Sequence, residues 1–185
     1  MQNLMFTFLL SLLSIAAFAQ NKALQFPEDF KLKAGETPKN FALTVIDEKA
    51  KAEGFMSNPM VVEVREFANG LYPLADVSKM KQMLLTIFSE QSPEGMDIDV
   101  VAVVYQSAAD LQSEIPKFST NQELKVFLVR DNYLVMVSGD LIGTYRGAVD
   151  KLATQLASRL GMKRLDIKDE SAMEPEPEAV EVSAE

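Results

Sequence analysis

Ile98 to Tyr105, with the sequence IDVVAVVY, is the most hydrophobic strand that the sequence predicts. Isoleucine, valine and tyrosine are all common in strands. Because the run is nearly continuous rather than alternating, we expect both faces of this strand to be buried. The stretch therefore predicts the central strand of a sheet that is covered on both sides.

Three further strands are expected around it. In residues 60–67 (MVVEVREF), Val62 and Val64 would face one side and Glu63 and Arg65 the other. Residues 124–130 and 133–138 flank Asp131-Asn132, a two-residue loop whose side chains tolerate positive φ. These two strands therefore predict a β-hairpin, which Gly139 closes.

Four helices are expected, over about residues 38–53, 76–91, 107–115 and 145–160. In the last, Tyr145, Val149, Leu152, Leu156 and Leu160 form an apolar stripe, and Gly161 follows as the C′ residue. The helix over 76–91 would begin at Asp76 as N-cap and carry a stripe of Val77, Met80, Leu84, Ile87 and Phe88.

The helix over 38–53 has an open alternative. Residues 41–45 (FALTV) alternate as a strand would, but the following DEKAKAE is strongly helix-forming, so we favour a helix that ends at Gly54. The resulting order, α-β-α-β-α-β-β-α, predicts a single α/β domain with helices packed on a mixed sheet and a C-terminal hairpin and helix.

From Met60 to Leu160 the order β-α-β-α-β-β-α resembles the thioredoxin fold in topology alone. The family's redox motif belongs just after the first strand, where this chain reads ANGLYPLA over residues 68–75 and has no cysteine. The family's proline before the hairpin is also missing, because Pro116 lies eight residues before Leu124. The resemblance implies a redox-inactive version used for binding or scaffolding, and other mixed α/β folds fit the same order.

The two ends of the chain differ from its body. Residues 1–19 are uncharged and apolar and end in Ala17-Phe18-Ala19, which predicts a signal peptide cleaved before Gln20, although no lysine or arginine precedes the apolar run. Residues 169–185 hold seven acids, no base and two prolines, which predicts a disordered acidic tail. Residues 20–168 would form the domain, and we expect the mature protein to be periplasmic or secreted and not inserted in a membrane.

The amino-acid composition excludes several kinds of ligand and catalytic mechanism. Seven of the nine net negative charges lie in the tail, so residues 20–168 carry only −2, and no basic surface for nucleic acid is expected. With no cysteine and no histidine, thiol chemistry, Ser-His-Asp mechanisms and the commonest transition-metal sites are excluded. We therefore expect no cofactor. The ten methionines could suggest copper, but Met80, Met83 and Met136 fall in core patterns.

Three residues stand out as possible surface contacts. Asp97 and Asp99 lie on one face at the entrance to the central strand, where paired carboxylates can bind a hard cation or share acid and base roles. A solvated strand end is the favoured interpretation of both, because no third ligand lies nearby in the sequence. Tyr72, in a Gly-Leu-Tyr-Pro turn, is a plausible contact residue. We predict no catalytic, cofactor-binding or metal-ligating residue.

The leading interpretation is an exported, non-catalytic protein that binds another protein or a small ligand. It depends on a good core pattern that lacks a reactive group of residues. One alternative is an accessory of envelope assembly that uses the acidic tail. Another is a hydrolase based on carboxylates or lysine, which would need distant acids such as Glu63 and Asp99 to meet in a cleft.

Overall fold

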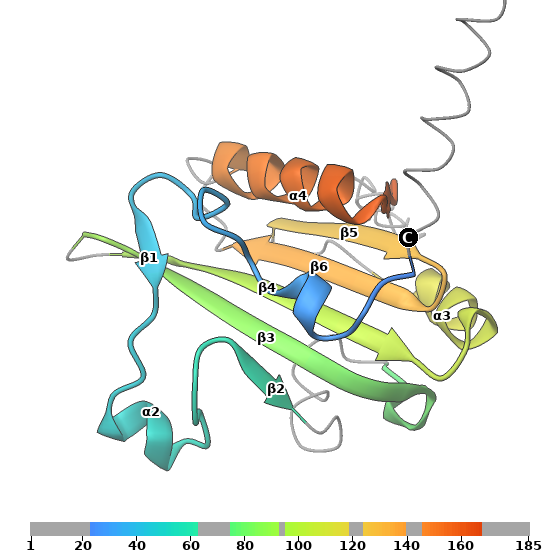
Figure 1. The fold of residues 1–185 in the computed structure, drawn as a ribbon, viewed down its shortest axis with the longest axis horizontal. Coiled ribbons are helices and arrows are strands. Elements are labelled where there is room, and N and C mark those ends of the chain that lie inside the picture. The colour runs from blue at the N-terminus through green and yellow to red at the C-terminus, as the bar shows by residue number, and fades with distance from the viewer. Residues whose placement is uncertain (1–22, 63–74, 93–94, 119–123, 140–145, 168–185) are drawn as a thin grey trace, which may run out of the picture.

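The computed structural model describes residues 23–62, 75–92, 95–118, 124–139 and 146–167. Its main feature is a seven-stranded sheet in the order β1-β3-β4-β6-β5-β7, with β2 also paired to β3 (Figure 1). The strands are β1 (Phe41–Leu43), β2 (Met60–Val62), β3 (Met80–Glu90), β4 (Asp97–Tyr105), β5 (Leu124–Arg130), β6 (Tyr133–Gly139) and β7 (Lys163–Arg164). The helical segments are η1 (Glu28–Phe30), α2 (Glu48–Ala52), η3 (Val77–Lys79), α3 (Ala108–Glu114), η4 (Ile115–Lys117) and α4 (Arg146–Leu160).

The predicted fold class is wrong. Every strand pairing among the described residues is antiparallel, so the sheet is not mixed, and helices do not alternate with strands along the chain. The molecule is dominated by its sheet, and α4 is its one long helix among the described residues. Two predicted helices, over 38–53 and 76–91, account for the error because both contain strands.

The largest correction concerns residues 76–91. Only Val77–Lys79 are helical there, and Met80–Glu90 form β3, which pairs with β4 along most of its length. Its residues 83–88 (MLLTIF) place Leu84, Thr86 and Phe88 on one face and Met83 on the other, and all four are buried. A helical stripe could not bury both sets, whereas a strand between two packed layers can.

The helix expected over 38–53 is also mostly absent. Phe41–Leu43 form the edge strand β1, and the helix is limited to Glu48–Ala52. Asn40 has φ of 69°, which a continuous right-handed helix excludes. The helix-forming residues do form the short helix α2. It begins after Asp47, which is its N-cap and accepts a hydrogen bond from the amide of Ala50.

Several other predictions are confirmed. β4 occupies the predicted central position and is almost wholly buried along residues 98–105. The hairpin of β5 and β6 turns at Asp131, whose φ is 52°. Ser107 caps α3 by accepting from the amide of Asp110. Of the strand predicted over 60–67, Met60–Val62 are β2, and the remainder lies outside the described residues.

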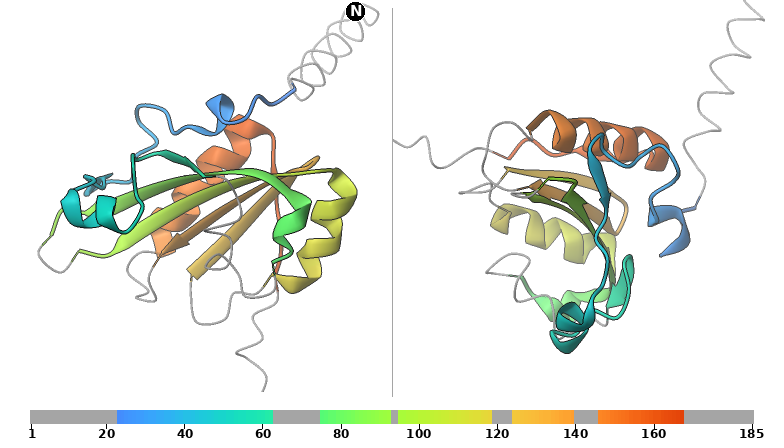
Figure 2. Two further views of the ribbon diagram at one scale, coloured as in Figure 1. Left: turned by 90° about the horizontal axis from the view of Figure 1, so that it is seen from below. Right: turned by 90° about the vertical axis from the view of Figure 1, so that its left-hand side faces the viewer.

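Helices and segments cover both faces of the sheet (Figure 2). On one face, α4 packs over β5 and β6, beside an N-terminal segment that contributes Phe30. On the other face, α3 and η4 pack with Leu111 and Phe118, and the Phe118 ring stacks on Phe127 with centroids 4.8 Å apart. No helix within the described residues is long and apolar enough to cross a membrane.

An arginine attaches the N-terminal segment to α4. The guanidinium of Arg159 binds both carboxylate oxygens of Glu36, at 2.5 Å from Nε and 3.1 Å from Nη2, and also donates to the carbonyl oxygen of Asp29. On the other side of the segment, the Tyr133 hydroxyl donates to the carbonyl oxygen of Leu24 at 3.1 Å. Side-chain bonds therefore hold this segment at both ends.

Gly161 ends α4 as predicted, with φ of 61°. The amide of Met162 donates to the carbonyl oxygen of Ala157 at 2.9 Å, which is the Schellman pattern. A Cβ at this position would also lie 3.2 Å from Nη1 of Arg130, which itself donates to the carbonyl oxygen of Leu160.

We therefore expect Gly161→Ala to lower the free energy of unfolding by roughly 1–2 kcal/mol, because an L-residue is strained in this conformation. Urea unfolding followed by circular dichroism would measure the change. Ser158→Ala, at an exposed position of the same helix, is the control and should cause little change. Equal stability of the wild-type and Gly161→Ala proteins would contradict this account of the helix end.

Candidate functional site

The predicted site residues do not form one site in the described structure. Tyr72 and Glu63 lie outside the described residues. Asp97 and Asp99 both lie in β4, on the same face of the strand, as the alternation predicts. Asp97 is exposed and Asp99 is partly buried.

Asp97 ends a short chain of hydrogen bonds that starts at Thr44, just after β1, and passes through β3 to β4. The hydroxyl of Ser89 donates to Oδ1 of Asp97 at 2.7 Å, and the hydroxyls of Thr44 and Ser89 lie 2.7 Å apart. Since Ser89 donates to Asp97, Thr44 is the donor to Ser89. No group of three or more acidic side chains within the described residues could hold a metal ion. The two aspartates therefore form a polar strand end, and their role as surface contacts stays a prediction.

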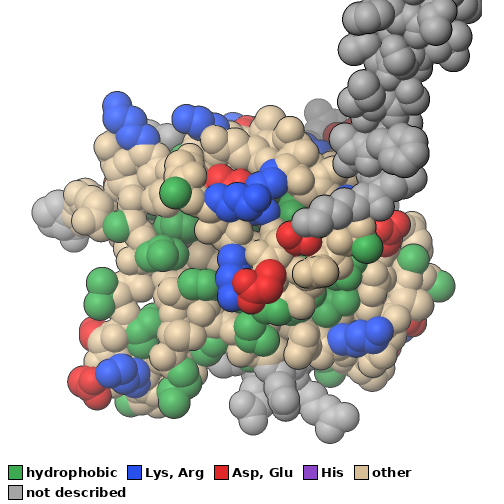
Figure 3. All heavy atoms as spheres, viewed as in Figure 1, with side chains coloured by type: hydrophobic (Ala, Val, Ile, Leu, Met, Phe, Trp, Pro, Cys, Tyr) green, Lys and Arg blue, Asp and Glu red, His purple; other side chains and the backbone are tan. Residues whose placement is uncertain are grey.

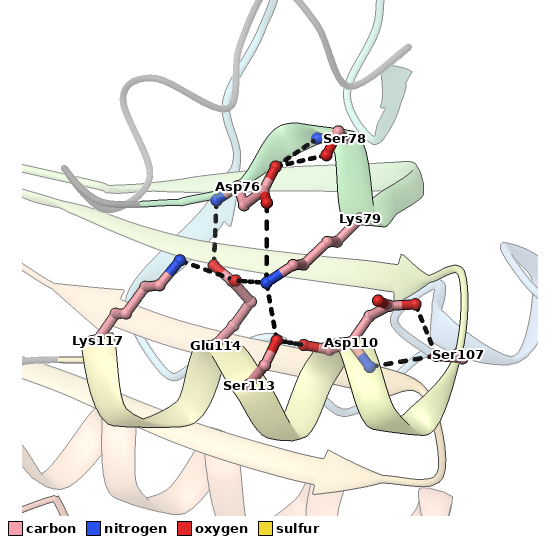
Figure 4. Close-up of polar contacts among 8 residues, drawn as sticks. All are labelled: Asp76, Ser78, Lys79, Ser107, Asp110, Ser113, Glu114 and Lys117. Carbon is pink, nitrogen blue, oxygen red and sulfur yellow. Dashed lines mark hydrogen bonds and ion pairs between the residues drawn. The ribbon is translucent and has the colours of Figure 1, made fainter.

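A buried carboxylate lies elsewhere, at the end of α3 (Figure 4). The Glu114 side chain is fully buried, and its Oε1 accepts from Nζ of Lys79 and from Nζ of Lys117, each at 2.8 Å. Its Oε2 accepts from the backbone amide of Asp76 at 3.0 Å. The contacts of Glu114 with Lys79 and Asp76 thus connect α3 to η3, just before β3, and its contact with Lys117 lies within α3 and η4.

The electrostatics of this cluster argue against catalysis. Burial by itself raises the pKa of Glu114, but the hydrogen bonds from Lys117, Lys79 and Asp76 outweigh burial and lower that pKa below its ordinary value of 4.5. The hydrogen bond to Glu114 raises the pKa of Lys79 above 10.5. At neutral pH the carboxylate is ionised and the amine protonated, so neither is a ready proton donor, base or nucleophile. The cluster is a structural connection.

The edge of the sheet at β1 and β2 is unusual in another way. The large hydrophobic side chains that are exposed in the described structure all come from 19 residues of sequence: Leu43 (45% exposed), Val45 (84%), Met56 (76%) and Val61 (47%). Figure 3 shows hydrophobic side chains over the region where β1, α2 and β2 lie. We call these four residues the apolar edge.

Register places two members of the apolar edge on one face of the sheet. Leu43 is opposite Phe88 and Val61 is opposite Leu84, and both partners belong to the core beneath α4. Val45 follows Leu43 by two residues in the same extended segment. Because α4 packs on β5 and β6, it does not reach this part of the sheet.

Among the described residues, the backbone at this edge also lacks a partner strand on its outer side. The amide of Thr44 donates to the carbonyl oxygen of Ile87, and the amide of Gln91 donates to that of Asn40. Since backbone groups alternate in direction along a strand, Leu43 and Val45 direct their N–H and C=O groups away from β3. No described strand pairs with β1 on that side.

Asn58 holds the edge rigidly against β3. Its side-chain nitrogen donates to the carbonyl oxygens of Thr44 (3.0 Å) and Ile87 (2.7 Å), and its side-chain oxygen accepts from the amide of Ile87 at 3.1 Å. The amide group thus fills the gap between β1 and β2 on β3. These bonds hold Thr44, between Leu43 and Val45, beside Ile87 of β3.

The opposite edge of the sheet is very different. It is formed by β7, which has only two residues, Lys163 and Arg164, both exposed and charged. Short, charged edge strands are a usual protection against further strand pairing. β1 is also short, but residues 43–45 (LTV) carry no charge, so this edge lacks the charge that protects β7.

Comparisons with known proteins add no family. No protein-family model matches the chain, and searches of curated proteins and of solved structures found no significant match. The thioredoxin resemblance therefore stays a prediction. The surface of the molecule is therefore the basis for its proposed function.

Proposed function

We propose that this chain is an exported, non-catalytic binding protein that holds an extended, apolar segment of another protein along its β1 edge. The observation that carries the proposal is the coincidence of exposed apolar side chains and outward-directed backbone groups at Leu43 and Val45. An added strand can use both, because main-chain hydrogen bonds supply affinity and alternate side chains supply specificity. Export is proposed from the apolar, uncharged residues 1–19.

The size of the apolar edge favours a peptide segment over a second copy of the chain. A stable dimer interface involves about 20–30 residues from each partner. The apolar edge has four exposed apolar side chains, of which Leu43 lies in the three-residue strand β1 and Val61 in the three-residue strand β2. This is enough for a short strand that binds weakly, and too little for a symmetric dimer.

The test is selection of a displayed library of random twelve-residue peptides against residues 20–185. We expect selected peptides to share alternating apolar residues and to lose binding to Val45→Asp by about tenfold or more, since burial of one such side chain is worth about 1.5–3 kcal/mol. Val45 is 84% exposed, so the substitution should leave the fold intact. Ser158→Asp, on exposed α4, is the matched control and should bind normally.

Two results would reject the proposal. One is a selection that enriches no peptide, or only peptides that bind Val45→Asp as well as they bind the wild-type protein. The other is self-association of the wild-type protein that Val45→Asp abolishes, because the edge would then be occupied by a second copy. Analytical ultracentrifugation of both proteins distinguishes the second result.

A further inference from the structure

A pocket lies between the N-terminal segment and α4, away from the apolar edge. Its volume is about 230 Å³, and residues 35–39 form one wall while Gly147, Ala148, Lys151, Leu152 and Gln155 of α4 form the other. Sites for drug-sized ligands are larger, about 300–1,000 Å³. The pocket therefore suits a small molecule or ion.

The pocket is positively charged. Lys39 and Lys151 come from opposite walls, and neither side chain makes an ion pair or hydrogen bond within the described structure. Glu36 is the one carboxylate among the lining residues, and the guanidinium of Arg159 binds it through both oxygens. Since that ion pair neutralises Glu36, two positive charges on the walls remain unbalanced.

Other features of the walls are compatible with an anion. Gly35 and Gly147 present no side chain, and a Cβ at either would have no neighbour within 4 Å, so both backbones are open to approach. Gly147 and Ala148 belong to the first turn of α4, where amide groups have no acceptor within the helix. These amides supplement the two ammonium groups and do not define the site alone.

We propose that this pocket binds a small oxyanion, of the phosphate or carboxylate class, through Lys39 and Lys151. The proposed ligand is a free small anion. No residue that lines the pocket belongs to the apolar edge, so the two proposed sites are separate.

The test is an NMR titration of the full mature chain with inorganic phosphate and, separately, with succinate at constant ionic strength. We expect saturable amide shifts confined to residues 35–39 and 147–155 with at least one of the two anions. Lys39→Gln and Lys151→Gln should each weaken binding by about fivefold, the upper range for one exposed charge contact. Lys81→Gln, which changes an exposed lysine of β3, is the matched control and should bind as the wild-type protein does.

Shifts with neither anion, or shifts spread over the whole surface without saturation, would overturn the proposal. Equal losses in Lys39→Gln and Lys81→Gln would do the same, because they would show that only the total charge matters. Since all three lysines are exposed, none of these variants is expected to unfold, and unchanged spectra away from the substitution would verify this.

Discussion

Thr86→Lys is expected to unfold the protein or to lower its free energy of unfolding by more than about 4 kcal/mol. Thr86 is 2% exposed and lies in β3 opposite Val100, on the face covered by α4. A lysine there would place an unpaired charge in the core. Urea unfolding followed by circular dichroism would measure the loss.

This substitution distinguishes the observed strand β3 from the helix that the sequence predicts, because the two place Thr86 in different surroundings. In the helix that the sequence predicts over 76–91, Thr86 lies outside the apolar stripe and a lysine would be harmless. Thr154→Lys, at an exposed position of α4, is the control and should change stability by less than about 0.5 kcal/mol. A Thr86→Lys protein as stable as the wild type would show that residues 80–90 are not a strand of the core.

Glu114→Ala should lower the free energy of unfolding by about 3 kcal/mol, since it removes one partner of a buried ion pair. The side chains of Lys79 and Lys117 are 27% and 31% exposed, so both ammonium groups can turn toward water, which keeps the loss at the low end for such changes. The matched control is Glu53→Gln, at the exposed end of α2, for which little change is expected. A loss no larger than that of the control would mean that Glu114 does not connect α3 to β3.

The same cluster predicts a pH dependence of stability. The folded-state pKa of Glu114 is lowered, so its contribution is complete above the ordinary value of 4.5 and is lost as the pH falls through the folded pKa. The wild-type protein should therefore lose more stability than Glu114→Gln when the pH is lowered below 4.5. Parallel pH profiles of the two proteins would contradict this assignment.

Local signals in the sequence were sufficient for the elements in the second half of the chain. The hairpin, α3 and α4 are each specified by nearby residues: Asp131 at the turn, Ser107 as N-cap and Gly161 as C′. The central position of β4 followed from its continuous apolar run. In all four cases the local preference agrees with the final packing.

The sequence failed where an element depends on distant partners. Residues 80–90 satisfy a helical stripe and a strand equally, and only pairing with β4 decides between them. Likewise FALTV at 41–45 alternates as an edge strand does, and Phe41–Leu43 form one, although the residues that follow favour a helix. The apolar edge is hidden for the same reason, since Leu43 and Val45 fall within the helix that the sequence predicts over 38–53.

Ion pairs between residues that are far apart in the sequence could not be predicted from it either. The nearby Lys117 does not by itself indicate that Glu114 would be the fully buried acid, because its other partners, Lys79 and Asp76, lie 35 and 38 residues away. The pocket between Lys39 and Lys151 is likewise formed by segments that only the fold brings together. The aspartates at 97 and 99 could be placed from alternation alone, because both lie on one strand.

Backbone hydrogen exchange at Leu43 and Val45 tests the central claim most directly. In the protein alone, both amides point away from β3, so they should exchange quickly, while the amide of Thr44, bonded to Ile87, is protected. With a saturating amount of a selected apolar peptide, we expect the amides of Leu43 and Val45 to become protected. If the peptide binds and both amides still exchange as fast as before, the bound segment does not pair with β1, and the proposed function is wrong.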